Sequence, residues 1–156
     1  MSMERARAHL TKYGLEDRIQ EFTESSATVE LAAQRLGVEP ARIAKTLSFL
    51  VEDHAVLVVA AGDVKVDNPK YKAAFHTKAR MLSREQAEDL VGHGVGGVCP
   101  FGVKEGVQVY LDESLRRFET VYPAVGTPAS AIALTIPELE RASEYVQWVD
   151  VTKPMA

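Results

Sequence analysis

The sequence predicts a compact α+β fold in a single domain that spans residues 1–156. Its 156 residues suit one hydrophobic core, and its 46% hydrophobic and 26% charged residues are ordinary for a globular protein. Segments with strand patterns are numerous and often adjacent in the chain, and helical segments fall between them irregularly. This order favours a mixed α+β fold over a regular series of βαβ units.

The first half of the chain is predicted to hold three helices and the most buried strand. An amphipathic helix over 3–14 ends at Gly14, because glycine is common just after a helix. Thr28 can cap a second helix, which ends at Gly37. The segment 54–63 is continuously apolar for most of its length and predicts a strand buried on both faces. The remaining elements of this half are a short strand at 17–22, a helix start at Pro40 that turns extended through residue 50, and a helix at 68–75.

The second half is predicted to hold two capped helices and several strands. Ser83 and Gln86 form a capping box at the start of a helix over 83–92, and Thr135 and Glu138 form another. The second box begins a helix at 135–143, and strands are expected at 107–112, 118–126, 130–135 and 145–151.

The segment 92–106 is a glycine-rich loop that holds six of the ten glycines of the chain. It is not a P-loop, because no Gly-Lys-Ser/Thr follows, and it is not a dinucleotide fingerprint, because it leads into a strand. Its backbone can approach a ligand closely and present N–H and C=O groups to it. The alternative is a permissive connection with no ligand.

Cys99, the only cysteine, lies within this loop. A nucleophilic cysteine needs a lowered pKa and a base, and no local signature pairs it with His93, the nearest histidine. We therefore expect Cys99 to be a small apolar filler. One cysteine and four dispersed histidines predict no metal site.

Positive charge is concentrated in residues 65–84, which hold six basic side chains and a single acid, Asp67. The rest of the chain is acidic, because the net charge is −4. A basic patch on an acidic body suits a defined anionic partner, although a solvated helix face would look similar. The basic residues are Lys65, Lys70, Lys72, Lys78, Arg80 and Arg84.

Lys45 lies inside the otherwise apolar segment 43–50. A lysine there must extend its amine to solvent or meet a partner. The second case would place a fixed cation in a pocket that suits a phosphate, a carboxylate or a ribose hydroxyl.

No apolar run approaches the roughly 20 residues that span a bilayer, and the first ten residues lack the apolar region of a secretory signal. We expect a cytoplasmic protein that makes no contact with a membrane.

Four segments share their order and spacing with a known enzyme family. Residues 28–51 hold a helix that ends in Leu-Gly-Val before Lys-Thr-Leu, and 57–67 hold an apolar strand before Gly-Asp and Val-Asp. Residues 96–102 read "GGVCPFG", and 121–135 form a strand–loop–strand that contains a glycine. Over about residues 14–150 the chain resembles the YbaK-type aminoacyl-tRNA deacylases, also found as the editing domain inserted in bacterial prolyl-tRNA synthetases.

The resemblance implies a mixed, partly barrel-like sheet surrounded by helices. It also implies hydrolysis of the ester between a wrong amino acid and the 3′-terminal adenosine of tRNA, without a metal or organic cofactor. The implied catalytic residues are Lys45, Gly96 and Gly97. The implied substrate-binding residues are Thr46, Val98, Cys99, Pro100, Phe101, Gly126 and Ser130. The basic residues expected to meet the tRNA acceptor end are Lys65, Lys70, Lys72, Lys78 and Arg80, and a synthetase is a second candidate partner.

Three functions remain open at this point. The first is a free-standing deacylase for a small amino acid, acting in trans. The second is a non-catalytic module that binds tRNA or an aminoacyl-nucleotide; it is motivated by the loop "GTPASA" at 126–131, where many family members carry basic residues. The third is a thiol hydrolase that uses Cys99. The sequence leaves open the amino acid, the tRNA and the oligomeric state.

Overall fold

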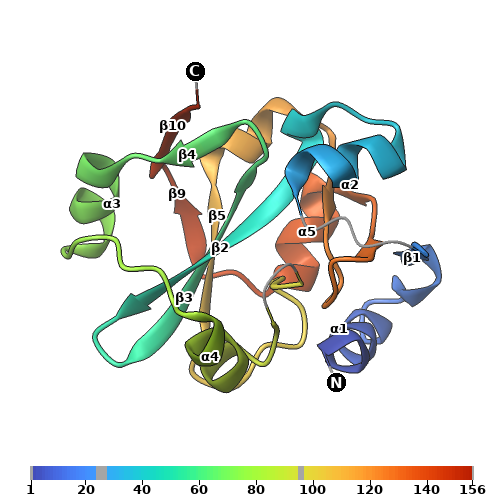
Figure 1. Ribbon diagram of the computed structural model, residues 1–156, viewed down its shortest axis with the longest axis horizontal. Helices are drawn as coiled ribbons and strands as arrows, with labels where there is room; N and C mark the ends of the chain where they lie inside the picture. Colours follow the sequence, from blue (N-terminus) through green and yellow to red (C-terminus); the bar gives the residue numbers. More distant parts are fainter. Residues whose placement is uncertain (1, 24–27, 95–96, 156) are drawn as a thin grey trace.

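The computed structural model describes residues 2–23, 28–94 and 97–155. A mixed sheet of six strands in the order β8-β6-β2-β3-β5-β9 twists strongly through the molecule (Figure 1). The pairs β2–β3 and β6–β8 are antiparallel, and β2–β6, β3–β5 and β5–β9 are parallel. Two small ribbons, β1–β7 and β4–β10, flank this sheet. The mixed α+β architecture agrees with the predicted fold class.

The strands are short except at the centre of the sheet. They are β1 (Gln20–Glu21), β2 (Ile43–Val51), β3 (His54–Ala61), β4 (Val64–Val66), β5 (Gln108–Asp112), β6 (Thr120–Pro123), β7 (Ser130–Ala131), β8 (Leu134–Thr135), β9 (Gln147–Val149) and β10 (Thr152–Pro154). The α-helices are α1 (Ser2–Thr11), α2 (Val29–Leu36), α3 (Asn68–Phe75), α4 (Arg84–Gln86) and α5 (Ile136–Ser143). Helices of the 3₁₀ type cover Glu16–Arg18, Pro40–Arg42 and Glu113–Arg117, and a π-helix covers Ala87–Val91.

The central strand β3 is buried on both faces. Alternate side chains of a strand point to opposite faces, and here Leu57 joins the larger core cluster while Val58 joins the smaller one. The larger cluster includes Leu10 of α1 and Leu139 of α5, and the smaller includes Tyr71 of α3. Helices therefore cover both faces of the sheet, which confirms the prediction made from the apolar run.

The predicted caps are present. Thr28 Oγ1 accepts from the Leu31 N–H, and both capping boxes form. They begin α2, α4 and α5, so the sequence located these helix starts correctly.

Several element predictions are wrong. The predicted strand at 17–22 is a 3₁₀ helix followed by the two-residue β1, and 130–135 divides into β7 and β8. The expected helix over 83–92 becomes a π-helix after one turn, because the Gly92 N–H bonds to the Ala87 carbonyl five residues earlier. The strands β4 and β10 were not predicted. Each has only three residues, and each forms by pairing with the other.

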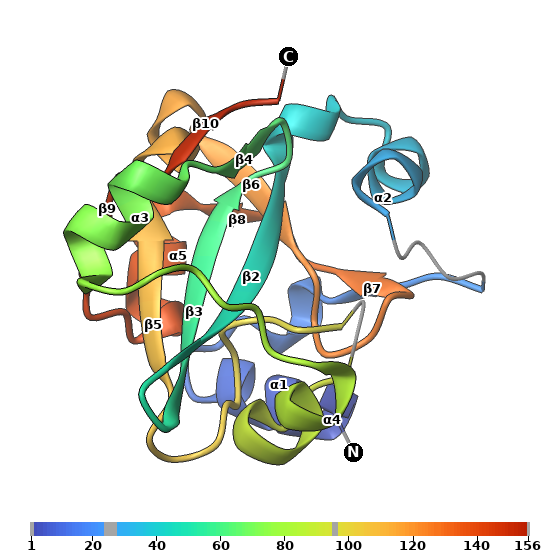
Figure 2. The same ribbon diagram turned by 60° about the vertical axis from the view of Figure 1, so that its left-hand side comes forward.

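Two segments outside the sheet approach strand β2 (Figure 2). The segment 76–83 leaves α3 and crosses β3 and β2 on its way to α4, and α2 lies on the β2 side of the sheet. Within the described ranges, no helix combines the length and apolar composition needed to cross a bilayer.

Candidate active site

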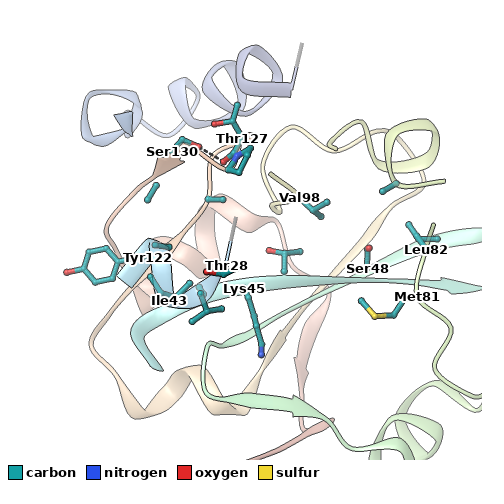
Figure 3. Close-up of a pocket in the computed structure, with 18 of the residues that line it drawn as sticks. Thr28, Ile43, Lys45, Ser48, Met81, Leu82, Val98, Tyr122, Thr127 and Ser130 are labelled. Atoms are coloured by element: carbon teal, nitrogen blue, oxygen red, sulfur yellow. Dashed lines mark hydrogen bonds between the residues drawn. The ribbon is translucent and has the colours of Figure 1, made fainter. Parts of the chain in front are cut away.

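A cavity of about 310 Å³ opens where β2 changes its neighbour on one edge (Figure 3). The start of β2 pairs with β6 through Ile43 and Ala44. Further along, the Leu82 N–H bonds to the Ser48 carbonyl at 3.1 Å, and the Leu50 N–H bonds to the Arg80 carbonyl at 2.8 Å. Between these two partners, residues 45–47 have neither neighbour on this edge, and the cavity fills the gap.

The main chain of Thr46 faces this gap. In an antiparallel strand the N–H and C=O of one residue point to the same edge, and the direction alternates along the strand. Because Ser48 and Leu50 direct theirs away from β3, Thr46 does so as well. Its side chain also lines the cavity, and its buried Oγ1 has no hydrogen-bond partner in the described part of the chain. A buried unpaired hydroxyl costs about 1–3 kcal/mol, and a polar ligand that reached it would relieve that cost.

The glycine-rich loop meets the loop that contains Gly126. A Cβ atom built on Gly97 would lie 2.4 Å from the Gly126 carbonyl oxygen and 2.6 Å from the Thr127 nitrogen. Only glycine permits this approach, and Gly126 itself has a left-handed backbone with φ of +82°. The two loops therefore form one continuous wall, from which Val98 and Thr127 line the cavity.

Ser130 holds the second loop in shape. Its Oγ donates to the Thr127 carbonyl at 3.0 Å and accepts from the Val125 N–H at 3.0 Å. The side chain lines the cavity but is 5% exposed, so its hydroxyl is engaged in the loop. Pairing of β7 with β1 fixes the same segment from the other side.

Lys45 is half-buried at the edge of the cavity. Its amine donates to the Val64 carbonyl of β4, and Figure 3 shows it directed away from Val98 and Thr127. Burial lowers the pKa of the Lys45 amine, and the charges of Asp63 and Glu30 oppose that shift. The cation is thus fixed between the cavity and β4.

Cys99 and His93 are close together, which the sequence did not reveal. The Cys99 Sγ lies 3.6 Å from the His93 Nε2, which also lies 2.6 Å from the Phe101 carbonyl oxygen. Both side chains are fully buried. Burial raises the pKa of the Cys99 thiol to about 12 and lowers the pKa of the His93 imidazole. The thiol therefore stays protonated and has no access to solvent, so this pair does not form an activated nucleophile.

The other residues named from the sequence fall into three groups. Of the residues expected to bind substrate, Thr46, Val98 and Ser130 line the cavity, whereas Cys99, Pro100, Phe101 and Gly126 are buried in or behind its wall. Gly97 shapes the wall, and Gly96 lies outside the described residues. Lys65, Lys70, Lys72, Lys78 and Arg80 are all exposed.

Sequence reasoning missed two parts of the cavity. One is the start of α2, where Thr28, Val29 and Ala32 line it, and the other is the segment Met81–Ser83. The capping residues Thr28 and Ser83 were the available signals, because each marks a helix start, but nothing in the sequence shows that these starts face β2.

Among the described residues, no group of three or more histidine, cysteine, aspartate or glutamate side chains could hold a metal ion. Apart from Lys45 at its edge, the polar side chains that line the cavity carry hydroxyls. Such a site can orient a water molecule and bind a carbonyl oxygen.

Comparison with known proteins identifies the family. The aminoacyl-tRNA editing domain matches residues 23–142. The chain belongs to this family. It is 51% identical over 154 residues to YwhH of Bacillus subtilis (strain 168), covering 98% of both chains. It is 29% identical to EbsC of Enterococcus faecalis, described provisionally as a Cys-tRNA(Pro)/Cys-tRNA(Cys) deacylase, over 84% of this chain and 80% of that one.

A solved structure supports the same conclusion. A crystal structure described provisionally as a trans-editing enzyme for prolyl-tRNA synthetase superposes with a TM-score of 0.88 at 30% identity, covering 97% of both chains. The family resemblance and the fold class expected from the sequence are confirmed. The editing domain is an ester hydrolase that acts on mischarged aminoacyl-tRNA.

Proposed function

We propose that this editing domain acts in trans, in the cytoplasm, and removes a small amino acid from the 3′-terminal adenosine of a tRNA. The match with YwhH and with the trans-editing structure over almost the whole of each chain supports action outside a synthetase. The observation that carries the proposal is the unpaired, buried Thr46 hydroxyl in the wall of a cavity at a broken strand edge.

The cavity provides what hydrolysis of an aminoacyl ester needs. Such an ester is already activated, so an oriented water and donors for the developing oxyanion are sufficient. Water adds to the acyl carbon, the ester C–O bond breaks, and the ribose hydroxyl leaves with the proton. A neighbouring ribose hydroxyl can assist this transfer, so no side-chain base is required. Thr46 contributes its hydroxyl and main chain, and the joined loops at Gly97 and Gly126 close the opposite wall.

The lining favours a small, weakly polar side chain. Apolar residues form most of it, including Val29, Ala32, Val98 and Ala124. At about 310 Å³ the cavity lies at the lower limit of ligand pockets. An apolar pocket discriminates by exclusion, by about 1–3 kcal/mol per methylene, so larger aminoacyl groups are rejected at its walls.

Lys45 is assigned to the terminal nucleotide rather than to the aminoacyl group. Its amine lies on the β4 side of β2, away from Val98 and Thr127, so it can reach a phosphate or ribose oxygen of the nucleotide whose ester enters the cavity. The hydrogen bond to the Val64 carbonyl would then hold the amine ready for that contact.

The test is deacylation of tRNA(Pro) charged with alanine, serine, cysteine, threonine or proline. We expect cleavage of the smaller esters. Thr46→Val should reduce the rate constant about 10- to 100-fold, because it removes one hydroxyl worth about 1–3 kcal/mol. The matched variant Thr46→Ser, which keeps the hydroxyl, should retain most of the activity. Lys45→Ala should raise KM for the tRNA. An inactive wild type on every ester, or full activity of Thr46→Val and Lys45→Ala, would contradict the proposal.

A further inference from the structure

Most of the cations without a side-chain partner in the described part of the chain lie close together in sequence, between residues 65 and 84. Of the 18 lysines and arginines, all of which the structure describes, twelve make a side-chain ion pair, hydrogen bond, ring contact or other interaction. Among the described residues, no such partner is found for the side chains of the other six. These six are Lys65, Lys72, Lys78, Arg80, Arg84 and Lys153.

Lys153 lies far from the others in sequence but next to Lys65 in space. The strands β4 and β10 are antiparallel, and their register places Lys153 directly opposite Lys65. Both side chains are exposed, and like charges directly opposite on a sheet are destabilising. An anion bound between the two amines would relieve this repulsion.

The position of β10 is built into the fold. The carboxylate of Asp112 is fully buried and accepts from the Val151 N–H at 2.9 Å and from the Thr152 Oγ1 at 2.7 Å. Lys70 of α3 donates to the Thr152 carbonyl at 2.9 Å and pairs with Asp150 at 3.0 Å. Lys70 is thus a clamp between α3 and β10 rather than a free cation, and Lys153 is held on a fixed strand.

The six cations follow the chain from β4 and β10 to the cavity. Both ribbon views place β4, β10 and α3 together at one side, and the segment 76–83 runs from α3 across β3 and β2 (Figures 1 and 2). Lys78 and Arg80 lie on this segment. Its end, Met81–Ser83, lines the cavity, and Arg84 follows directly. Lys65 and Lys153 lie at one end of this basic track, on the β4 side of the cavity, because the Lys45 amine at the cavity edge donates to the carbonyl of Val64, the neighbour of Lys65.

We propose that Lys65 and Lys153 form a phosphate clamp on the β4–β10 ribbon that binds the backbone of the tRNA acceptor arm beside the cavity. The inference rests on the proposed function, because the ester in the cavity is joined to a polyanion whose terminal nucleotide is assigned to Lys45, and the Lys45 amine bonds to the Val64 carbonyl next to Lys65. An acidic protein surface would be the other kind of partner. A nucleic acid is favoured because the track leads to the site where its terminal nucleotide reacts. Lys153 also lies beyond residues 23–142, which match the family.

The test measures the salt dependence of binding of a 5′-labelled, uncharged tRNA(Pro) transcript, so it does not depend on turnover. Each lost phosphate contact lowers the slope of log Kd against log salt by about 0.7–0.9. The double variant K65Q/K153Q should therefore lower it by about 1.4–1.8, and between 50 and 200 mM salt the wild type should lose about 7- to 12-fold more affinity than the variant. K65R/K153R should keep the wild-type slope.

The control K12Q/K104Q removes the same charge from lysines that contact Glu144 and the Asp89 carbonyl. It should leave the slope unchanged. An unchanged slope in K65Q/K153Q, or an equal change in K12Q/K104Q, would overturn the clamp.

For hydrolysis, K65Q/K153Q should raise KM for charged tRNA but not for an aminoacylated CCA trinucleotide, which lacks the acceptor stem. A KM raised equally for the trinucleotide would show that these lysines bind the terminal nucleotides rather than the acceptor stem, and would also overturn the clamp. A wild type that binds tRNA but cleaves no ester would refute the proposed function alone.

Discussion

Replacing Gly97 by alanine should damage activity far more than stability. The added Cβ would lie 2.4 Å from the Gly126 carbonyl oxygen, about 1 Å inside an ordinary van der Waals contact of 3.4 Å, and the neighbouring atoms are backbone. The two loops must therefore separate by about 1 Å. Overpacking of this kind costs about 1–3 kcal/mol of the free energy of unfolding. A displacement of 1 Å in the wall of a catalytic site can cost about 100-fold in rate.

The assay is single-turnover deacylation of the best ester, together with the free energy of unfolding from urea titration. Gly94→Ala is the matched control in the same loop, because its Cβ would meet only the end of the flexible Glu88 side chain at 3.2 Å. We expect the control to remain within about threefold of the wild type, since a flexible side chain can move aside. A Gly97→Ala protein that deacylates at the wild-type rate would refute the idea that contact between the loops shapes the site.

Two further substitutions separate structural roles from catalytic ones. Cys99→Ala should keep near-wild-type deacylation, because the thiol is buried and its pKa is raised to about 12; a rate that falls with this substitution alone, at unchanged stability, would show that the thiol reacts. Hydrogen bonding from Arg18, and then from the Thr135 N–H, lowers the pKa of the Glu138 carboxyl to about 2 from 4.5. A carboxyl whose pKa is lower in the folded state than in the unfolded state stabilises the fold at any pH above the unfolded pKa. This stabilisation is lost as the pH falls through the folded pKa, so the free energy of unfolding should decrease between pH 4.5 and about 2. Glu138→Gln should flatten that decrease and cost about 0.5 kcal/mol at pH 7, measured by urea titration across this range.

Sequence patterns predicted the elements that are stabilised by residues close to them in the chain. The caps at Thr28, Ser83 and Thr135 act within three residues, and all three helix starts were correct. The apolar run that became β3 was correct because burial on both faces requires apolar side chains at every position. The glycines of the loop could likewise be recognised as a place of close backbone approach.

Elements that form only by pairing with a segment far away in the sequence could not be predicted. Neither β4 nor β10 has a pattern of its own, since each is a strand only through its pairing with the other. Lys153 therefore carried no signal, and nothing in the sequence shows that Lys70, grouped there with the other basic residues, pairs with Asp150. The cavity itself has the same origin, because it exists only where β2 passes from β6 to the segment 80–82.

The arrangement of residues 98 and 99 shows why the working part of the loop is its backbone. Val98 lines the cavity, whereas its neighbour Cys99 is fully buried beside His93. Burial moves the pKa values of the thiol and the imidazole in opposite directions, and both changes favour the neutral forms. The loop's two groups with nucleophile and base chemistry are therefore neutral and turned away from the substrate. In the mechanism that we propose, hydrolysis is left to water positioned by main-chain groups and by Thr46, which is enough for an ester that is already activated.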